Sequence, residues 1–128
     1  MEEVYRPDPN GPPLVVEFTL AGAPYMILNG GMAFEHTPAV SISVLTRDQD
    51  ETDRLWDALT EDGEEGDCGW LKDRWGMHWQ IVPEALPIMM ASDDKIAAGR
   101  AHAAMMQMNR IDIAALTAAF EGREETGQ

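Results

Sequence analysis

Cysteine is nearly absent from this sequence of 128 residues, and long apolar runs are missing. Cys68 is the single cysteine, so an internal disulfide is impossible and the chain is not a disulfide-stabilised secreted domain. No apolar run approaches the roughly 20 residues that a membrane-spanning helix needs. The opening segment, Met1 to Arg6, has no basic stretch followed by an apolar one, so it does not resemble a secretory signal. We therefore expect a cytoplasmic protein.

Basic residues are also scarce, with 9 Lys and Arg against 23 Asp and Glu, which gives a net charge near −14. A chain this acidic is repelled by phosphate backbones and by anionic lipid head groups, which argues against nucleic acids and membrane surfaces as partners. The charge permits a cationic ligand without requiring one. Three acidic segments are expected to be solvated faces and loops: 48–57, 61–67 and 121–125.

The length and a hydrophobic fraction of 45% fit one domain, residues 1–128, with one well-formed core. The first 13 residues contain four prolines and predict a loop or a connection between short strands. Apolar and β-branched runs then predict strands. Gly22 to Pro24 should end the first of them, and Asp73 to Gly76 should form a tight turn between the last two. The predicted strands are 14–20, 25–29, 39–45, 68–72 and 77–82.

Helices are expected where apolar residues recur at helical spacing behind a capping residue. Asp48, with Glu51 three positions later, predicts a helix that continues to Thr60. Pro83 should end the sheet and open a short helix that continues to Met90. Two further helices are expected behind Asp93 or Asp94 and behind Asp112. Methionines are abundant in this C-terminal part and predict a packed core or a subunit interface, or a ligand-binding surface.

The stretch from Gly66 to Pro83, GDCGWLKDRWGMHWQIVP, resembles the PhnB-like family of the vicinal-oxygen-chelate (glyoxalase/bleomycin-resistance) superfamily. Asn29-Gly30-Gly31 and the tail from Ala104 to Leu116 add to the resemblance. It implies an α+β fold in which βαβββ modules form a cup-shaped mixed sheet around a ligand site. Residues 14–31 would be the remnant of an incomplete first module, 39–83 the second module and 84–120 C-terminal helices.

Relatives begin with a strand and a helix that would precede Met1. An open sheet edge in the first module would be free to pair with another chain. We therefore expect a homodimer in which the partner, or the methionine-rich C-terminal helices, covers the gap.

The metal-using relatives chelate their ion with His and Glu on inward strand positions. The resemblance places the His at Ser41 and the Glu at Gln80, but serine is a poor ligand and glutamine lacks the charge of a carboxylate. The three histidines of this chain, His36, His78 and His102, do not complete a ligand set. We therefore expect neither a bound metal nor a cofactor.

Strand alternation still predicts a polar floor for the cup, because Ser41, Ser43, His78 and Gln80 should share one sheet face. The alternative is that these side chains only form hydrogen bonds across the strands. Cys68 is either a nucleophile, helped by Lys72, or a small buried apolar residue. Trp70, Trp75 and Trp79 either form an aromatic wall or divide between core and interface. The candidate ligand-binding residues are Ser41, Ser43, His78, Gln80, Trp70 and Cys68.

Three functions follow from the resemblance. The first is binding of a small molecule, cationic or aromatic, without chemical change. The second is an enzyme of the superfamily, a lyase, isomerase or transferase, which includes the label of 3-demethylubiquinone-9 3-methyltransferase that many relatives have. No glycine-rich strand-to-helix turn for a nucleotide-like cofactor accompanies that label. The third is a dimeric assembly or regulatory component.

Overall fold

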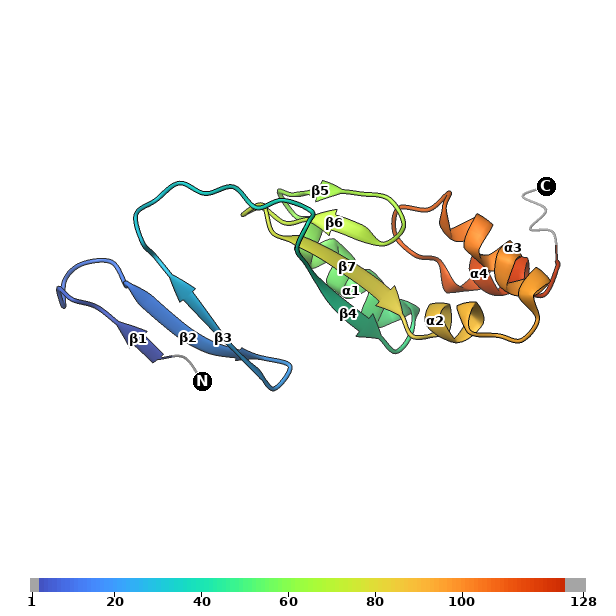
Figure 1. Ribbon diagram of the computed structural model, residues 1–128, viewed down its shortest axis with the longest axis horizontal. Helices are drawn as coiled ribbons and strands as arrows, with labels where there is room; N and C mark the ends of the chain where they lie inside the picture. Colours follow the sequence, from blue (N-terminus) through green and yellow to red (C-terminus); the bar gives the residue numbers. More distant parts are fainter. Residues whose placement is uncertain (1–2, 124–128) are drawn as a thin grey trace. The chain divides into compact units, whose positions relative to one another are not determined.

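The computed structural model describes residues 3–123 and divides the chain into two compact units, Met1–Phe34 and Glu35–Gln128. The fold is mixed α+β (Figure 1): the first unit contains a three-stranded sheet, and the second contains a four-stranded sheet with four helices. Among the described residues, none of the helices has both the length and the apolar character that spanning a bilayer requires.

The first unit consists of β1 (Glu3–Tyr5), β2 (Val15–Leu20) and β3 (Ala23–Leu28), paired antiparallel in that order. Ala21 and Gly22 connect β2 to β3, and both have positive φ angles, of 50° and 83°. Two such residues form the tight hairpin turn whose twist matches that of its strands. The sequence correctly predicted the hairpin.

Pro24 was expected to separate the two strands, but it lies inside β3, opposite Thr19. The Asn29 N–H donates to the Leu14 carbonyl at 2.8 Å, and hydrogen-bonded pairs alternate with non-bonded ones along an antiparallel ladder. The Thr19–Pro24 pair is therefore non-bonded, and the backbone nitrogen of Pro24 faces the outer edge. An edge position requires no N–H donor, so proline is tolerated there.

The second unit contains β4 (Ser41–Thr46), α1 (Gln49–Thr60), β5 (Glu64–Glu65), β6 (Trp70–Lys72) and β7 (His78–Pro83). The order across the sheet is β4-β7-β6-β5, and β4 is parallel to β7. This is the βαβββ module that the sequence predicted. β5 is an addition, because its two glutamates were expected in a loop.

α1 covers one face of this sheet. Trp56 of α1, Leu71 of β6 and Ile81 of β7 are each no more than 1% exposed and form the core, with Leu55 and Leu59 packed beside them. The helix begins as predicted, since the Asp48 carboxylate accepts the Glu51 N–H at 2.8 Å. Such capping stabilises a helix start by about 1 kcal/mol.

The C-terminal helices are α2 (Ala85–Met90), α3 (Lys95–Met105) and α4 (Ile113–Phe120). Asp94 and Asp112 cap α3 and α4 through their carboxylates. A second core forms around Leu86, Ile111 and Leu116, with partly buried residues packed against it: Val82, Met89, Met90, Ala104, Met105 and Met108.

Two backbone hydrogen bonds of 2.8 Å fasten these helices to the module, from Cys68 N to Met108 O and from Gly69 N to Asn109 O. Cys68 and Gly69 have positive φ angles, of 58° and 84°. These angles take both residues out of the strand that was expected to start at Cys68, so β6 begins at Trp70. The left-handed pair turns its N–H groups toward the α3–α4 connection.

Replacing Gly69 tests this connection. A Cβ atom on Gly69 would lie 2.9 Å from the Ile81 carbonyl oxygen, and the φ of 84° disfavours any side chain. We expect Gly69→Ala to destabilise the protein by about 2–4 kcal/mol in urea unfolding. Gly99→Ala is the matched control, since its Cβ would meet nothing within 4 Å on α3, and it should be neutral or stabilising. Equal effects of both substitutions would refute this role for Gly69.

A second test concerns the start of α1. The Arg47 guanidinium donates to the Glu51 carboxylate at 2.8 Å and its backbone N–H donates at 3.1 Å, and these bonds lower the Glu51 pKa below the ordinary 4.5. A lowered pKa contributes stability that is present above the unfolded pKa and lost as the pH falls through the folded one. Wild type should therefore melt above Glu51→Gln at pH 7, and the difference should vanish as pH falls below 4.5. A difference that stays constant in melts down to pH 3 would contradict the assignment.

Candidate functional site

One face of the four-stranded sheet includes polar side chains of β4 and β7, and the opposite face packs on α1. The register pairs Ser41 with His78 and Ser43 with Gln80, and Trp70 lies opposite Gln80 on β6. Residues that pair directly across strands share a face. The structure therefore puts these five predicted site residues on one side of the sheet, which we call the polar face. Their role in ligand binding stays a prediction.

Gln80 and Ser41 are joined across β4 and β7. The Gln80 amide nitrogen, Nε2, donates to the Ser41 hydroxyl oxygen at 2.9 Å. Within residues 3–123, no protein donor contacts the amide oxygen of Gln80. Ser41 thus fixes the direction of the amide and leaves its carbonyl oxygen available as an acceptor.

A pocket of about 540 Å³, open to solvent, lies where the polar face meets the C-terminal helices. We call it the sheet–helix pocket. Cys68, Trp70 and Gln80 line its sheet side together with Val82. Its helix side is formed by residues of α2 and α3 and the residue after α2: Leu86, Pro87, Met90, Ala91 and Met105.

The pocket unites half of the predicted site residues. Ser41 contributes only through its bond to Gln80, and Ser43 is exposed on the polar face. His78 lies instead beside Glu64 and Lys72, around a separate hollow of about 150 Å³. The sequence did not single out Met90 and Met105. The abundance of methionine in the C-terminal part of the sequence was a signal for a ligand-binding surface, but core packing explained this abundance equally well.

Among residues 3–123 no charged side chain lines the sheet–helix pocket, whose polar side-chain groups are the Gln80 amide, the Cys68 thiol and the Trp70 indole N–H. The net charge of −14 is therefore not concentrated at this site. A concave, largely apolar surface with a few fixed polar groups is the usual form of a small-molecule site.

The three tryptophans do not form one aromatic wall, so that reading was wrong. Trp79 lies on the α1 side of the sheet, where its indole N–H donates to the Asp73 carboxylate at 2.9 Å. Trp75 is 75% exposed in the turn, with the Arg74 guanidinium 5.1 Å from its ring centre. Alternation along β7 and the turn before it separate these two rings from Trp70.

The three histidines lie on different elements. His36 is in the loop before β4, His78 is on β7 and His102 is on α3. Among residues 3–123, no three His, Cys, Asp or Glu side chains are grouped as a metal ion would require. The expectation that no metal is bound stays a prediction.

Cys68 is half-buried, and its sulfur lies 3.7 Å from the Met106 sulfur. A reactive thiolate needs a nearby cation or a helix N-terminus. The Cys68 thiol contacts the Met106 thioether, which supplies no positive charge. The thiol forms part of the pocket wall, and its chemical role stays a prediction.

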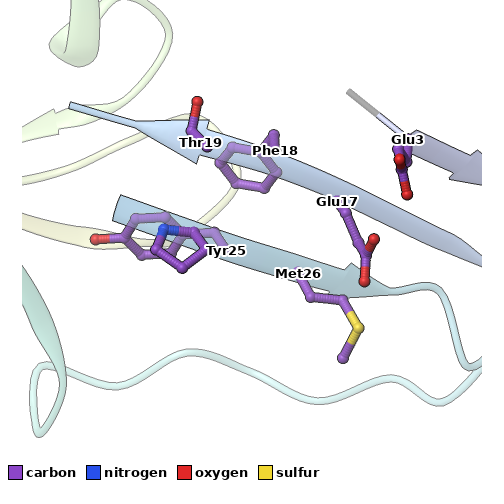
Figure 2. Close-up of a pocket in the computed structure, with 7 residues that line it drawn as sticks. Glu3, Glu17, Phe18, Thr19, Tyr25 and Met26 are labelled. Atoms are coloured by element: carbon purple, nitrogen blue, oxygen red, sulfur yellow. The ribbon is translucent and has the colours of Figure 1, made fainter. Parts of the chain in front are cut away.

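A second hollow, of about 470 Å³, lies on the first unit (Figure 2). Glu17 and Met26 extend to the same side of β2 and β3, as their pairing requires. The stacked rings of Phe18 and Tyr25, 5.6 Å apart, alternate to the opposite face. Glu3 pairs directly with Glu17, a like-charged arrangement that destabilises a sheet. No core supports this hollow, so we place the candidate site in the sheet–helix pocket.

With this geometry established, comparison with known proteins decides the family. The model of the family described as 3-demethylubiquinone-9 3-methyltransferase matches residues 2–82, more than half of the chain. The chain belongs to this PhnB-like family. The resemblance in the sequence is thus confirmed for the module, whereas the tail from Ala104 to Leu116 lies outside the matched residues. No curated protein matches the chain.

The similar solved structures include the two that follow. A PhnB protein from Bacillus cereus, provisionally described as a 3-demethylubiquinone-9 3-methyltransferase, is 28% identical with a TM-score of 0.56, over 65% of this chain and 76% of that one. Protein PA1353 from Pseudomonas aeruginosa is 20% identical with a TM-score of 0.50, over 61% of this chain and 71% of that one. The latter shows the fold alone. Together they confirm the predicted glyoxalase-type fold.

Proposed function

We propose that this protein binds a small molecule in the sheet–helix pocket. The observation that supports the proposal is the Gln80 amide, which Ser41 holds at 2.9 Å while its oxygen remains available. The surrounding Trp70, Val82 and Leu86 side chains exclude water from the acceptor when a ligand is present. A hydrogen bond made in such surroundings is stronger than one made in water.

An enzymatic function remains the alternative. It rests on the family description and on the fold, and folds of this kind host unrelated activities. The positions where metal-using relatives place their His and Glu are Ser41 and Gln80 here. These two side chains bond to each other, an arrangement suited to positioning a ligand. Binding without chemical change is therefore the function we propose.

A compound screen by thermal shift, followed by calorimetry of the compounds that stabilise, tests this function. Gln80→Met keeps the volume of the side chain and removes its amide, so affinity should fall about fivefold to tenfold. Ser41→Ala should weaken binding less, because it removes only the bond that orients the amide. Ser43→Ala, exposed on the same face, is the control and should change nothing. Ligands whose affinity is the same in Gln80→Met would place binding elsewhere.

We further propose that the chain forms a homodimer through the three-stranded sheet. Between residues 3 and 40 no residue is buried, and a small sheet without a covered face is not independently stable. One face of this sheet is entirely apolar, and we call it the apolar sheet face. Glu3 and Glu17 lie on the opposite face. The apolar sheet face consists of Val4, Val16, Phe18, Leu20, Tyr25 and Ile27.

Charge restricts which face of the sheet can form the contact between two copies. Two chains of net charge −14 repel each other, so they associate where neither brings a carboxylate to the contact. The apolar sheet face meets this condition and its opposite face does not. A two-fold axis would place the same patch of each chain in contact.

Light scattering across a concentration series tests the dimer. Ile27 and Met26 are neighbours on β3, 54% and 63% exposed, and point to opposite faces. We expect Ile27→Glu to yield monomers because it buries a charge in the contact. Met26→Glu should leave the dimer intact. A monomeric wild type, or equal dissociation by both variants, would refute the proposed contact.

A further inference from the structure

We infer that the sheet–helix pocket selects uncharged, flat aromatic molecules with one N–H or O–H donor, and that α2 and α3 make this selection. The inference rests on the proposed function of that pocket. It adds the chemical class of the ligand and assigns the choice of ligand to particular side chains. Three observations support it: the lack of charge in the described lining, the flat and thioether surfaces on the two sides of the pocket, and the acceptor oxygen of the Gln80 amide.

The first observation concerns charge. An anionic ligand would approach a chain of net charge −14 against repulsion and would find no cation in the lining. A cationic ligand would be attracted from a distance but would find no carboxylate in the pocket. Moving a charged group out of water without an opposite charge beside it costs more free energy than burial against an apolar surface provides. Neutral ligands avoid both penalties.

The second observation concerns shape. Trp70 gives the sheet side a large flat indole, and Met90 and Met105 give the helix side two thioethers. Aromatic rings stack on an indole with a gain beyond that of buried area alone. Thioether sulfur also contacts aromatic rings favourably, and methionine adapts its rotamer to their outline. A flat aromatic ring between these surfaces can stack on the indole and contact the thioethers. A puckered saturated ring of equal size can form neither of these aromatic interactions.

The third observation concerns the hydrogen bond. One of the two hydrogens on the Gln80 nitrogen is bonded to Ser41, whereas the amide oxygen accepts from none of the described residues. An oxygen accepts and cannot donate. A ligand with an N–H or O–H group therefore satisfies the Gln80 oxygen, whereas a ligand with only acceptors leaves that oxygen to water and can use only the second amide hydrogen.

The selecting side chains on α2 and α3 follow the residues that the family model matches. The family model ends at residue 82, whereas Leu86, Met90 and Met105 follow it on α2 and α3. Gln80 and Trp70 lie inside the matched region and offer the acceptor and one flat surface. We therefore assign the choice of ligand to the C-terminal helices, which line one side of the pocket.

Four probes of one skeleton separate these requirements by calorimetry on the full chain. 2-Naphthol has the flat neutral ring and the donor, and it should bind saturably with one site. 2-Methoxynaphthalene lacks the donor, decahydro-2-naphthol lacks the flat ring and 2-naphthoate is charged. Each of these three should bind at least fivefold more weakly than 2-naphthol.

Substitutions on the helices test the second part of the inference. Met90→Ala and Met105→Ala should each weaken 2-naphthol at least fivefold and reduce its advantage over decahydro-2-naphthol. Ile88→Ala on α2 and Ile96→Ala on α3 replace residues that are 70% and 76% exposed and do not line the pocket. These controls should match wild type. Urea unfolding of all four confirms that each variant is folded at the assay temperature.

The outcomes distinguish the two proposals. If other screened compounds bind and depend on Gln80, while the four probes bind equally or not at all, the ligand class is wrong and the proposed function stands. If 2-naphthol binds as expected but neither methionine substitution affects it, α2 and α3 do not select the ligand. If no compound or probe depends on Gln80, both proposals fail.

Discussion

The parallel ladder between β4 and β7 is the constraint on which the candidate site depends. It brings Ser41 beside His78 and Ser43 beside Gln80, although these pairs are far apart in the sequence. Because side chains alternate along a strand, one register decides both faces of the sheet at once. Ile81 is buried against α1 while Gln80, its neighbour, turns to the polar face. A shift of one residue would exchange core and site, so the buried face against α1 fixes the position of the Gln80 amide.

The C-terminal helices become part of the site through a short stretch of unusual backbone. Cys68 and Gly69 both have positive φ, and their N–H groups bond the α3–α4 connection at 2.8 Å. Gln49 adds a second link from α1, since its amide nitrogen donates to the Ile111 carbonyl and its amide oxygen accepts from the Ile113 N–H. These bonds hold Met105 near Trp70, so a pocket wall that the family model does not cover is attached to a module that it does.

The two sheets of this chain differ in how far their apolar faces are buried. The four-stranded sheet buries one face under α1, with Trp56 at its centre. The three-stranded sheet has a complete ladder and a well-formed turn but no buried residue among those described. Backbone pairing alone yields little net stability in water, because the unfolded chain bonds equally well to solvent. Among the described residues, no element of its own unit covers the apolar sheet face, and this is the face through which we propose that two copies associate.

Local chemistry in the sequence determined most of the elements. Asp48, Asp94 and Asp112 cap the helices that they were expected to cap, and the alternation at Ser41 and Ser43 predicted a shared face. These features depend on neighbours a few residues away, which a sequence displays directly. The tertiary structure alone decided that Pro24 lies on a sheet edge and that Met90 and Met105 meet Gln80 across one pocket. Those outcomes depend on register and on contacts between distant segments, and neither composition nor spacing specifies which segments meet.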